Sequence, residues 1–194
     1  MHMREALKKR TTQETEVEIF LRFEGQQQIT IDLPVPFFPH LLKSLAFFAN
    51  WDLTVRARGD VEIDYHHLIE DTGIVLGDTF RAAIGETKNI QRYSTHFIPM
   101  DESFSMVAVD LGGRPFLLYE VPHWGDRVGD FEGVLVEEFL RAFVNHAQLT
   151  LHAKTWWGNN GHHILESLFK ALGKALGEAV EFSGKSIPST KGII

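Results

Sequence analysis

The sequence repeats itself after 96 residues, and this internal repeat constrains the fold more than any other feature. The shift aligns residues 53–77 with 149–173 without a gap, and eight of these 25 positions are identical: Leu, Thr, Ala, His, His, Glu, Leu and Gly. The same offset aligns residues 41–52 with 137–148, which share a helical spacing of apolar residues. The chain is therefore expected to contain two copies of one structural unit.

Both copies show the same order of predicted elements. First strands at 16–24 and 104–111 end at glycines, and second strands at 28–34 and 115–121 are each stopped by a proline. These are followed by helices at 41–50 and 131–146, third strands at 53–58 and 149–154, and long helices that open with the paired histidines. The order β-β-α-β-α in each half predicts an α+β fold, with helices sandwiched between two sheets related by a pseudo-twofold axis.

The two halves are expected to form a single domain. They cover about residues 10–90 and 91–184, and no linker composition separates them; a tail follows at 185–194. A chain of 194 residues can bury a sizeable core as one unit. The N-terminal residues lack the apolar segment of a signal peptide, and the most apolar stretch, 36–51, is too short to span a bilayer. We therefore expect a cytoplasmic protein without a membrane partner.

Charge and cysteine content narrow the functional classes. With 19 basic and 26 acidic residues the net charge is -7, a balance that disfavours binding to the phosphate backbone of nucleic acids. The chain has no cysteine, which excludes disulfides, zinc-thiolate sites, iron-sulfur clusters and thiol nucleophiles. Any metal must therefore bind to histidine and carboxylate side chains.

Both long helices carry the motif His-His-x-x-Glu near their start. Glu70 lies one turn from His66 and His67, so its carboxylate can meet either imidazole. Adjacent residues point about 100° apart around a helix, so the two histidines of one pair are expected to serve two different ions. Two such motifs and a few further histidines predict two mixed nitrogen and oxygen sites, suited to manganese, iron, zinc or nickel.

For a single copy of the motif, a solvated histidine pair beside a glutamate is the commoner explanation. The second copy of the motif favours metal binding instead, because His162, His163 and Glu166 are retained while most neighbouring residues change. His152, on the strand before the second pair, has an arginine as its counterpart, and His40 stands apart from both motifs. For either of these two histidines alone, a partly buried histidine with a local partner is the usual alternative.

Several motifs together resemble the imidazoleglycerol-phosphate dehydratases, lyases of histidine biosynthesis. These are DYHHLIEDTGIVLG, IPMDESF, DLGGRP, GNNGHHILESLFKALGKALG and the terminal IPSTKG. The resemblance runs from residue 10 to residue 192, nearly the whole chain. It implies a fold like that of a ribosomal-protein second domain, the conversion of imidazole glycerol phosphate to imidazole acetol phosphate, and trimers that assemble into a 24-subunit shell with sites between subunits.

The resemblance also implies roles for individual residues. The two manganese ions expected at each site would be held by His40, His66, His67, Glu70, His152, His162, His163 and Glu166. The substrate and its phosphate would be bound by Glu14, Arg92, Arg114, Lys170, Ser189 and Lys191. Glu14, Glu70 and Glu166 are the expected proton-transfer residues, and the sequence does not distinguish their roles.

The chain departs from the family pattern mainly in the first-helix block. Pro39, Lys43, Ser44 and Phe48 replace the usual Asp, Asp, Gln and second His, and Gly112 replaces a Ser. The alternative function is therefore a divergent dimetal paralogue that acts on another phosphorylated substrate. Such a protein could be a metallohydrolase, in which the metals activate water, or a metal-dependent assembly without catalysis.

The expected reaction explains why metals are needed. The carbon-hydrogen bond that must break in the glycerol phosphate chain is not acidic unless the neighbouring imidazole relays electrons. We expect two cations beside the ring to favour its imidazolate form, and the cationic side chains to anchor the phosphate.

Overall fold

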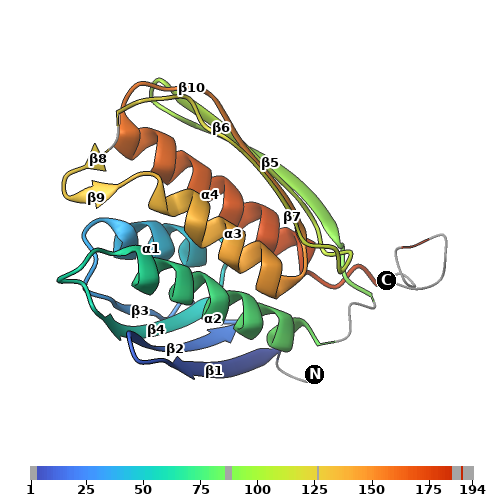
Figure 1. The fold of residues 1–194 in the computed structure, drawn as a ribbon. Helices are drawn as coiled ribbons and strands as arrows, with labels where there is room; N and C mark the ends of the chain where they lie inside the picture. Colours follow the sequence, from blue (N-terminus) through green and yellow to red (C-terminus); the bar gives the residue numbers. More distant parts are fainter. Residues whose placement is uncertain (1–3, 86–88, 126, 185–188, 190–194) are drawn as a thin grey trace.

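Two four-stranded sheets enclose the helices of this protein (Figure 1). The computed structural model describes residues 4–85, 89–125, 127–184 and 189. The first half contains β1 (Glu5–Thr11), β2 (Thr15–Arg22), β3 (Ile29–Asp32), α1 (Phe38–Phe48), β4 (Asp52–Gly59) and α2 (His66–Ile84). The second contains β5 (Tyr93–Met100), β6 (Ser103–Asp110), β7 (Phe116–Glu120), β8 (Arg127–Val128), β9 (Phe131–Glu132), α3 (Leu135–Ala147), β10 (Thr150–Trp157) and α4 (Gly161–Ala179).

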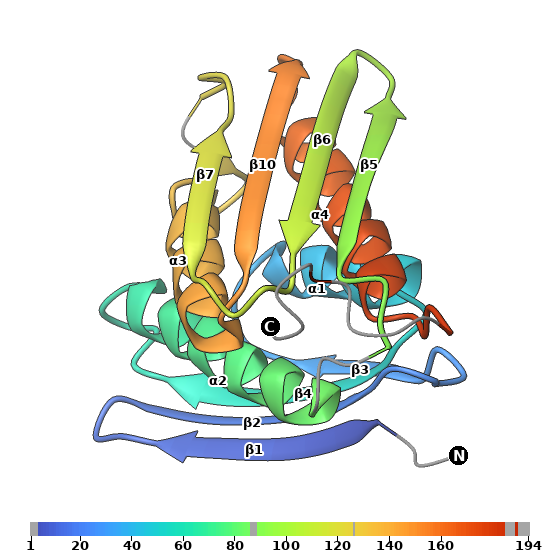
Figure 2. The same cartoon turned by 90° about the vertical axis from the view of Figure 1, so that its right-hand side faces the viewer.

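The two sheets have the same topology. Their strand orders are β1-β2-β4-β3 and β5-β6-β10-β7, and in each sheet only the last pair is parallel. The strands of one sheet run across those of the other (Figure 2). The prediction of two repeated α+β halves with helices between two sheets is therefore confirmed.

Each half begins with one strand more than the sequence pattern predicted. The order is β-β-β-α-β-α in the first half, and the second half has the two short strands β8 and β9 in addition before α3. The missed strands are β1 and β5, and both lie at a sheet edge. β1 is exposed along almost its whole length, so its sequence EALKKRT shows no apolar alternation. The helix predicted from residue 131 begins at Leu135, because the residues before it form the short β8-β9 hairpin.

The helices join the halves crosswise. α1 and α2 cover the first sheet, α3 and α4 cover the second, and α1 packs on α4 while α2 packs on α3 (Figures 1 and 2). The glycine that the repeat retains lies at these contacts. A Cβ on Gly77 would stand 2.7 Å from the carbonyl oxygen of Phe143, and one on Gly173 would stand 2.3 Å from that of Leu45. These glycines therefore allow the close helix packing that sets the positions of the functional side chains. None of the described helices is long and apolar enough to cross a membrane.

Candidate active site

Both long helices start in the same way, and this start places the histidine pairs. The backbone N–H of His66 donates to Oδ1 of Asp64 at 2.7 Å, and that of His162 donates to Oδ1 of Asn160 at 3.0 Å. Asp64 and Asn160 are equivalent in the repeat, and either side chain can satisfy a free N–H at a helix start. The replacement of Asp by Asn therefore preserves the geometry of the pair that follows.

His40, His162 and Glu166 converge at the N-terminal ends of α1 and α4. Nε2 of each histidine lies 2.9 Å from the same carboxylate oxygen, Oε2 of Glu166. The other oxygen, Oε1, forms an ion pair with Nζ of Lys170 at 2.9 Å. Burial raises the pKa of Glu166, but the hydrogen bonds from its three partners outweigh burial and lower the pKa to about 2. Glu166 is therefore ionised at neutral pH, with one oxygen facing two imidazoles.

His67 lies in a second cluster, with two carboxylates. Its Nδ1 is 2.9 Å from Oδ2 of Asp60 and 3.7 Å from Oε2 of Glu14. The hydrogen bond with Asp60 raises the pKa of His67. The second oxygen of Asp60, Oδ1, is buried and has no hydrogen-bond partner among the described residues. Because Nδ1 donates to Asp60, Nε2 of His67 is the ring nitrogen left to bind a ligand.

His163 has an equivalent arrangement in the second half. Its Nδ1 donates to Oε2 of Glu102 at 2.7 Å, which raises the pKa of His163. The same bond, together with backbone N–H groups at the start of α4, lowers the pKa of Glu102 to about 2. Glu102 occupies the turn between β5 and β6, as Glu14 occupies the turn between β1 and β2. The second histidine of each pair is thus held by carboxylates through Nδ1.

The other expected ligands do not join these clusters within one chain. Glu70 is exposed on α2, and the ring of half-buried His66 lies beside that of His67, with 6.0 Å between centroids. On β10, His152 lies between Leu151 and Ala153, and the side chains of these two neighbours are buried on the face that the helices cover. The side chain of His152 therefore lies on the outer face of the second sheet, where it contacts Phe116.

Two of the residues expected to bind phosphate meet at one carboxylate. Arg92 Nε donates to Oδ1 of Asp110 at 2.7 Å, and NH2 of Arg114 lies 3.6 Å from Oδ2. The Arg92 side chain is 9% exposed, whereas that of Arg114 is 74% exposed. A Cβ at Gly112 would stand 2.8 Å from both the Arg92 guanidinium and Asp110. The absence of a side chain at Gly112 therefore leaves room for this part-buried ion pair.

The phosphate-binding candidates are divided between two ends of the second sheet. Arg92 directly precedes β5, whereas Met100, the last residue of β5, contacts Lys170 through its sulfur at 3.7 Å. The backbone N–H of Arg92 donates to the carbonyl oxygen of Ala179, which follows Lys170 on α4 by a helix rise of about 14 Å. Ser189 is half-buried, and Lys191 lies outside the described residues.

Sequence reasoning missed three carboxylates of this region: Asp60, Glu102 and Asp110. Glu102 could have been found from the hairpin equivalence with Glu14, since both directly precede the second strand of their half. Asp60 gave no such signal, because its repeat counterpart is Trp156. Asp110 lies near the end of the strand predicted at 104–111, and only the fold shows that two arginines approach it.

Comparison with known proteins places the chain among the hydro-lyases, enzymes that remove water from their substrate. The model of the imidazoleglycerol-phosphate dehydratase family matches residues 34–176. The chain belongs to this family, and its reaction is the dehydration of imidazole glycerol phosphate in histidine biosynthesis. The predicted family, fold and reaction are confirmed, whereas the roles of single residues stay predictions.

The relatives match over most or all of their length. The chain is 47% identical to imidazoleglycerol-phosphate dehydratase of Thermoanaerobacter pseudethanolicus over 194 residues, covering 99% of this chain and 100% of the relative. The crystal structure of the dehydratase from Staphylococcus aureus superimposes with a TM-score of 0.82 at 37% identity, covering 92% of this chain and 99% of that one. The Pyrococcus furiosus enzyme, solved in complex with (S)-C348, gives a TM-score of 0.84 at 32% identity, covering 96% and 100%.

Proposed function

We propose that this dehydratase is metal-dependent and that His40, His162 and Glu166 form part of a divalent cation site. The observation that carries the proposal is the convergence of two imidazole nitrogens and one carboxylate oxygen within 4.8 Å of one another. This mixed nitrogen and oxygen donor set fits manganese, iron, zinc or nickel, and the chain has no cysteine thiolate to favour softer metals. Lys170 occupies only Oε1 of Glu166, so Oε2 remains directed at the imidazoles.

The second histidine of each pair fits the same chemistry. His67 and His163 each donate Nδ1–H to a carboxylate, an arrangement that fixes the ring and leaves Nε2 to bind a ligand, as in many metal-binding histidines. Nε2 of His163 lies 3.6 Å from Oδ2 of the exposed Asp101, beyond hydrogen-bond distance. We assign His66, His67, Glu70, His152 and His163 to the same pair of manganese sites, as the family resemblance implies. Two bound cations would stabilise negative charge on the imidazole ring of the substrate.

The chain's own side chains bind the substrate and move its protons. Lys170, Arg92, Arg114, Ser189 and Lys191 are assigned to the phosphate, which cationic donors hold through charge-assisted hydrogen bonds. Proton transfer is assigned to Glu14, Glu70 and Glu166. The Glu14 side chain is 57% exposed and lies beside His67, so it can exchange protons with solvent and still reach the cluster.

The site is proposed to form between chains. Within one chain Arg92 and Lys170 are separated by about 14 Å of rise along α4, and each is paired with a different carboxylate, Asp110 and Glu166, so they do not face one phosphate together. His152 lies on the outer face of the second sheet, away from the helix starts. That face carries stacked aromatic rings, including Phe97 and Trp157, whose exposed fractions are 52% and 64%. A second copy of the chain would cover this apolar surface, and we propose trimers that assemble into a 24-mer.

We also infer that the enzyme works in the cytoplasm. Its substrate carries a charged phosphate and does not cross a bilayer unaided, so the enzyme must share a compartment with the reaction that supplies it.

A dehydratase assay combined with metal analysis tests the proposal. Protein stripped with chelator should lose activity with imidazole glycerol phosphate and recover it on addition of Mn²⁺. E166Q should bind less metal than the wild type, measured by elemental analysis. E181Q, a control just beyond the opposite end of α4, should bind the same amount as the wild type. Full activity of protein with no measurable metal would refute the metal dependence.

A further inference from the structure

Close packing of α1 on α4 brings Phe48 to Lys170. A Cβ on Gly173 would stand 3.1 Å from Cβ of Phe48, so the two helices approach closely at this point because residue 173 is glycine. The ring centroid of Phe48 lies 5.7 Å from Nζ of Lys170. An ammonium group at this distance from an aromatic face is attracted to the negative face of the ring.

The described residues around Lys170 accept only part of the hydrogen bonds that its ammonium group can donate. Nζ carries three hydrogens, and one is directed to Oε1 of Glu166 at 2.9 Å. The sulfur of Met100, at 3.7 Å, is a weak acceptor, and the Phe48 ring attracts the charge without taking a conventional hydrogen bond. The Lys170 side chain is 22% exposed, so it is held in place and can still donate to an anion.

We propose that Phe48 is a positioning residue for substrate binding: its ring holds the Lys170 ammonium group so that its remaining N–H donors meet the substrate phosphate. This inference rests on the proposed assignment of Lys170 to phosphate. Phe48 stands where the family usually has histidine, and a histidine ring could itself donate a hydrogen bond. In this chain the aromatic face therefore acts through Lys170 and makes no hydrogen bond of its own to the anion.

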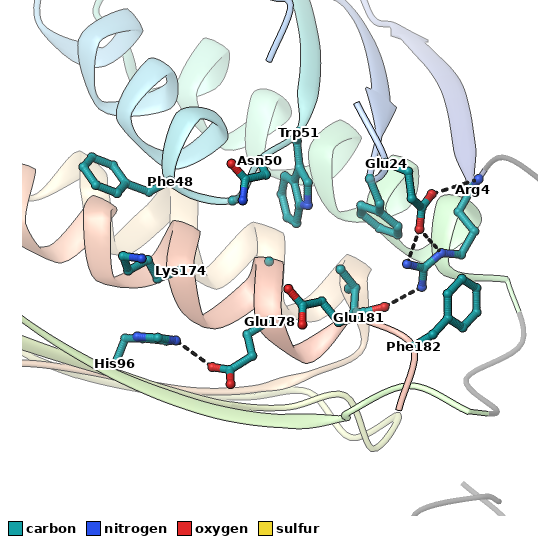
Figure 3. Close-up of a pocket in the computed structure, with 14 residues that line it drawn as sticks. Arg4, Glu24, Phe48, Asn50, Trp51, His96, Lys174, Glu178, Glu181 and Phe182 are labelled. Atoms are coloured by element: carbon teal, nitrogen blue, oxygen red, sulfur yellow. Dashed lines mark hydrogen bonds and ion pairs between the residues drawn. The ribbon is translucent and has the colours of Figure 1, made fainter. Parts of the chain in front are cut away.

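Lys174 provides an internal control. It lies one turn after Lys170 on α4 and is exposed. Lys174 and Phe48 line a cavity of about 460 Å³ that also includes His96 and Glu178 (Figure 3). Lys170 does not line this cavity. Phe48 thus borders two lysines of the same helix, and its ring is placed over the ammonium group of Lys170.

The test compares F48L, which removes the ring, with F48Y, which keeps it. We would measure KM and kcat for imidazole glycerol phosphate and the inhibition constant for inorganic phosphate. F48L should raise both KM and the inhibition constant about two- to five-fold, the range given by a cation–π contact of about 0.5–1 kcal/mol. F48Y and K174M should stay within about two-fold of the wild type, and kcat should change little in all three. Equal effects of F48L and F48Y, or a loss of kcat at constant KM, would overturn the proposal.

A double-mutant cycle separates this inference from the assignment on which it rests. K170M should weaken substrate and phosphate binding, and F48L should add nothing in the K170M background. If K170M leaves KM unchanged, the assignment of Lys170 to phosphate is wrong. If K170M raises KM but F48L has the same effect with and without Lys170, the assignment stands and the role of Phe48 is wrong. Thermal unfolding curves of all variants check that each is folded.

Discussion

Gly77 of α2 and Gly173 of α4 occupy the same position in the two repeats, and each lies against a backbone carbonyl of the helix on which it packs. Alanine in place of glycine normally stabilises a helix by up to about 1 kcal/mol. At Gly173 we expect the opposite sign, a loss of about 1–3 kcal/mol, because the new methyl group would overlap the backbone of α1. Urea unfolding of G173A measures the change.

Lys174, the exposed residue next to Gly173, provides the control substitution. K174A introduces the same residue one position later on α4, where the side chain is exposed, and should leave the stability nearly unchanged. A G173A variant more stable than the wild type would show that the helices can separate at this point without cost.

Removing the carboxylate that holds His163 should weaken metal binding. E102Q keeps the size of the side chain but replaces an ionised acceptor by an amide. Loss of such a partner of a metal-binding histidine typically lowers affinity about 10- to 100-fold. Competition with a chromophoric chelator measures the affinity. D101N, which changes a carboxylate that is 77% exposed and 3.6 Å from the ring of His163, should have a smaller effect.

Glu178 should make stability depend on pH in the acid range. Its carboxylate accepts hydrogen bonds from Ser94 Oγ at 2.6 Å and from His96 Nε2 at 2.7 Å, and these lower its pKa below the ordinary value of 4.5. A carboxyl group whose pKa is lowered by folding stabilises the fold above the unfolded value and loses this contribution as pH falls through the folded one. The Tm of E178Q should therefore lie below that of the wild type at pH 7, and the gap should narrow at pH 3.

Chelation should dissociate the assembly as well as inactivate it. Ligands that come from separate chains link those chains through the metal, so metal removal favours smaller species. Sedimentation velocity before and after chelation should show a large particle replaced by trimers, and Mn²⁺ should restore it. A particle that keeps its size with metal content near zero would show that packing alone maintains it.

Deletion of residues 188–194 should impair substrate binding selectively. Ser189 can donate through its hydroxyl and backbone N–H, and Lys191 adds a compact charge, a combination suited to phosphate. We expect a strongly raised KM, with metal content and thermal stability largely retained. Normal substrate affinity of the truncated protein would remove the tail from the site, and loss of metal would assign it to the assembly instead.

The repeat made most of the fold predictable, because identical spacing in two halves supports one topology for both. The edge strands β1 and β5 escaped prediction, since exposed strands lack the apolar alternation on which the inference depends. Within the site, the contact of His162 with Glu166 follows from helical spacing alone. The approach of His40 does not, because it depends on how α1 crosses α4, and crossing angles are decided by packing.

The crosswise helix contacts also bear on the history of the chain. A half-length protein bound to a copy of itself would form the same two contacts, α1 on α4 and α2 on α3, so the present chain has the form of two fused partners. In such a homodimer every change would appear twice. In a single chain the two halves can differ: His40 faces Glu166, whereas the position equivalent to His40 is Val136, buried in the core, and Glu70 is exposed. Within one chain the two copies of the motif can therefore have different surroundings, one beside a third histidine and the other without it.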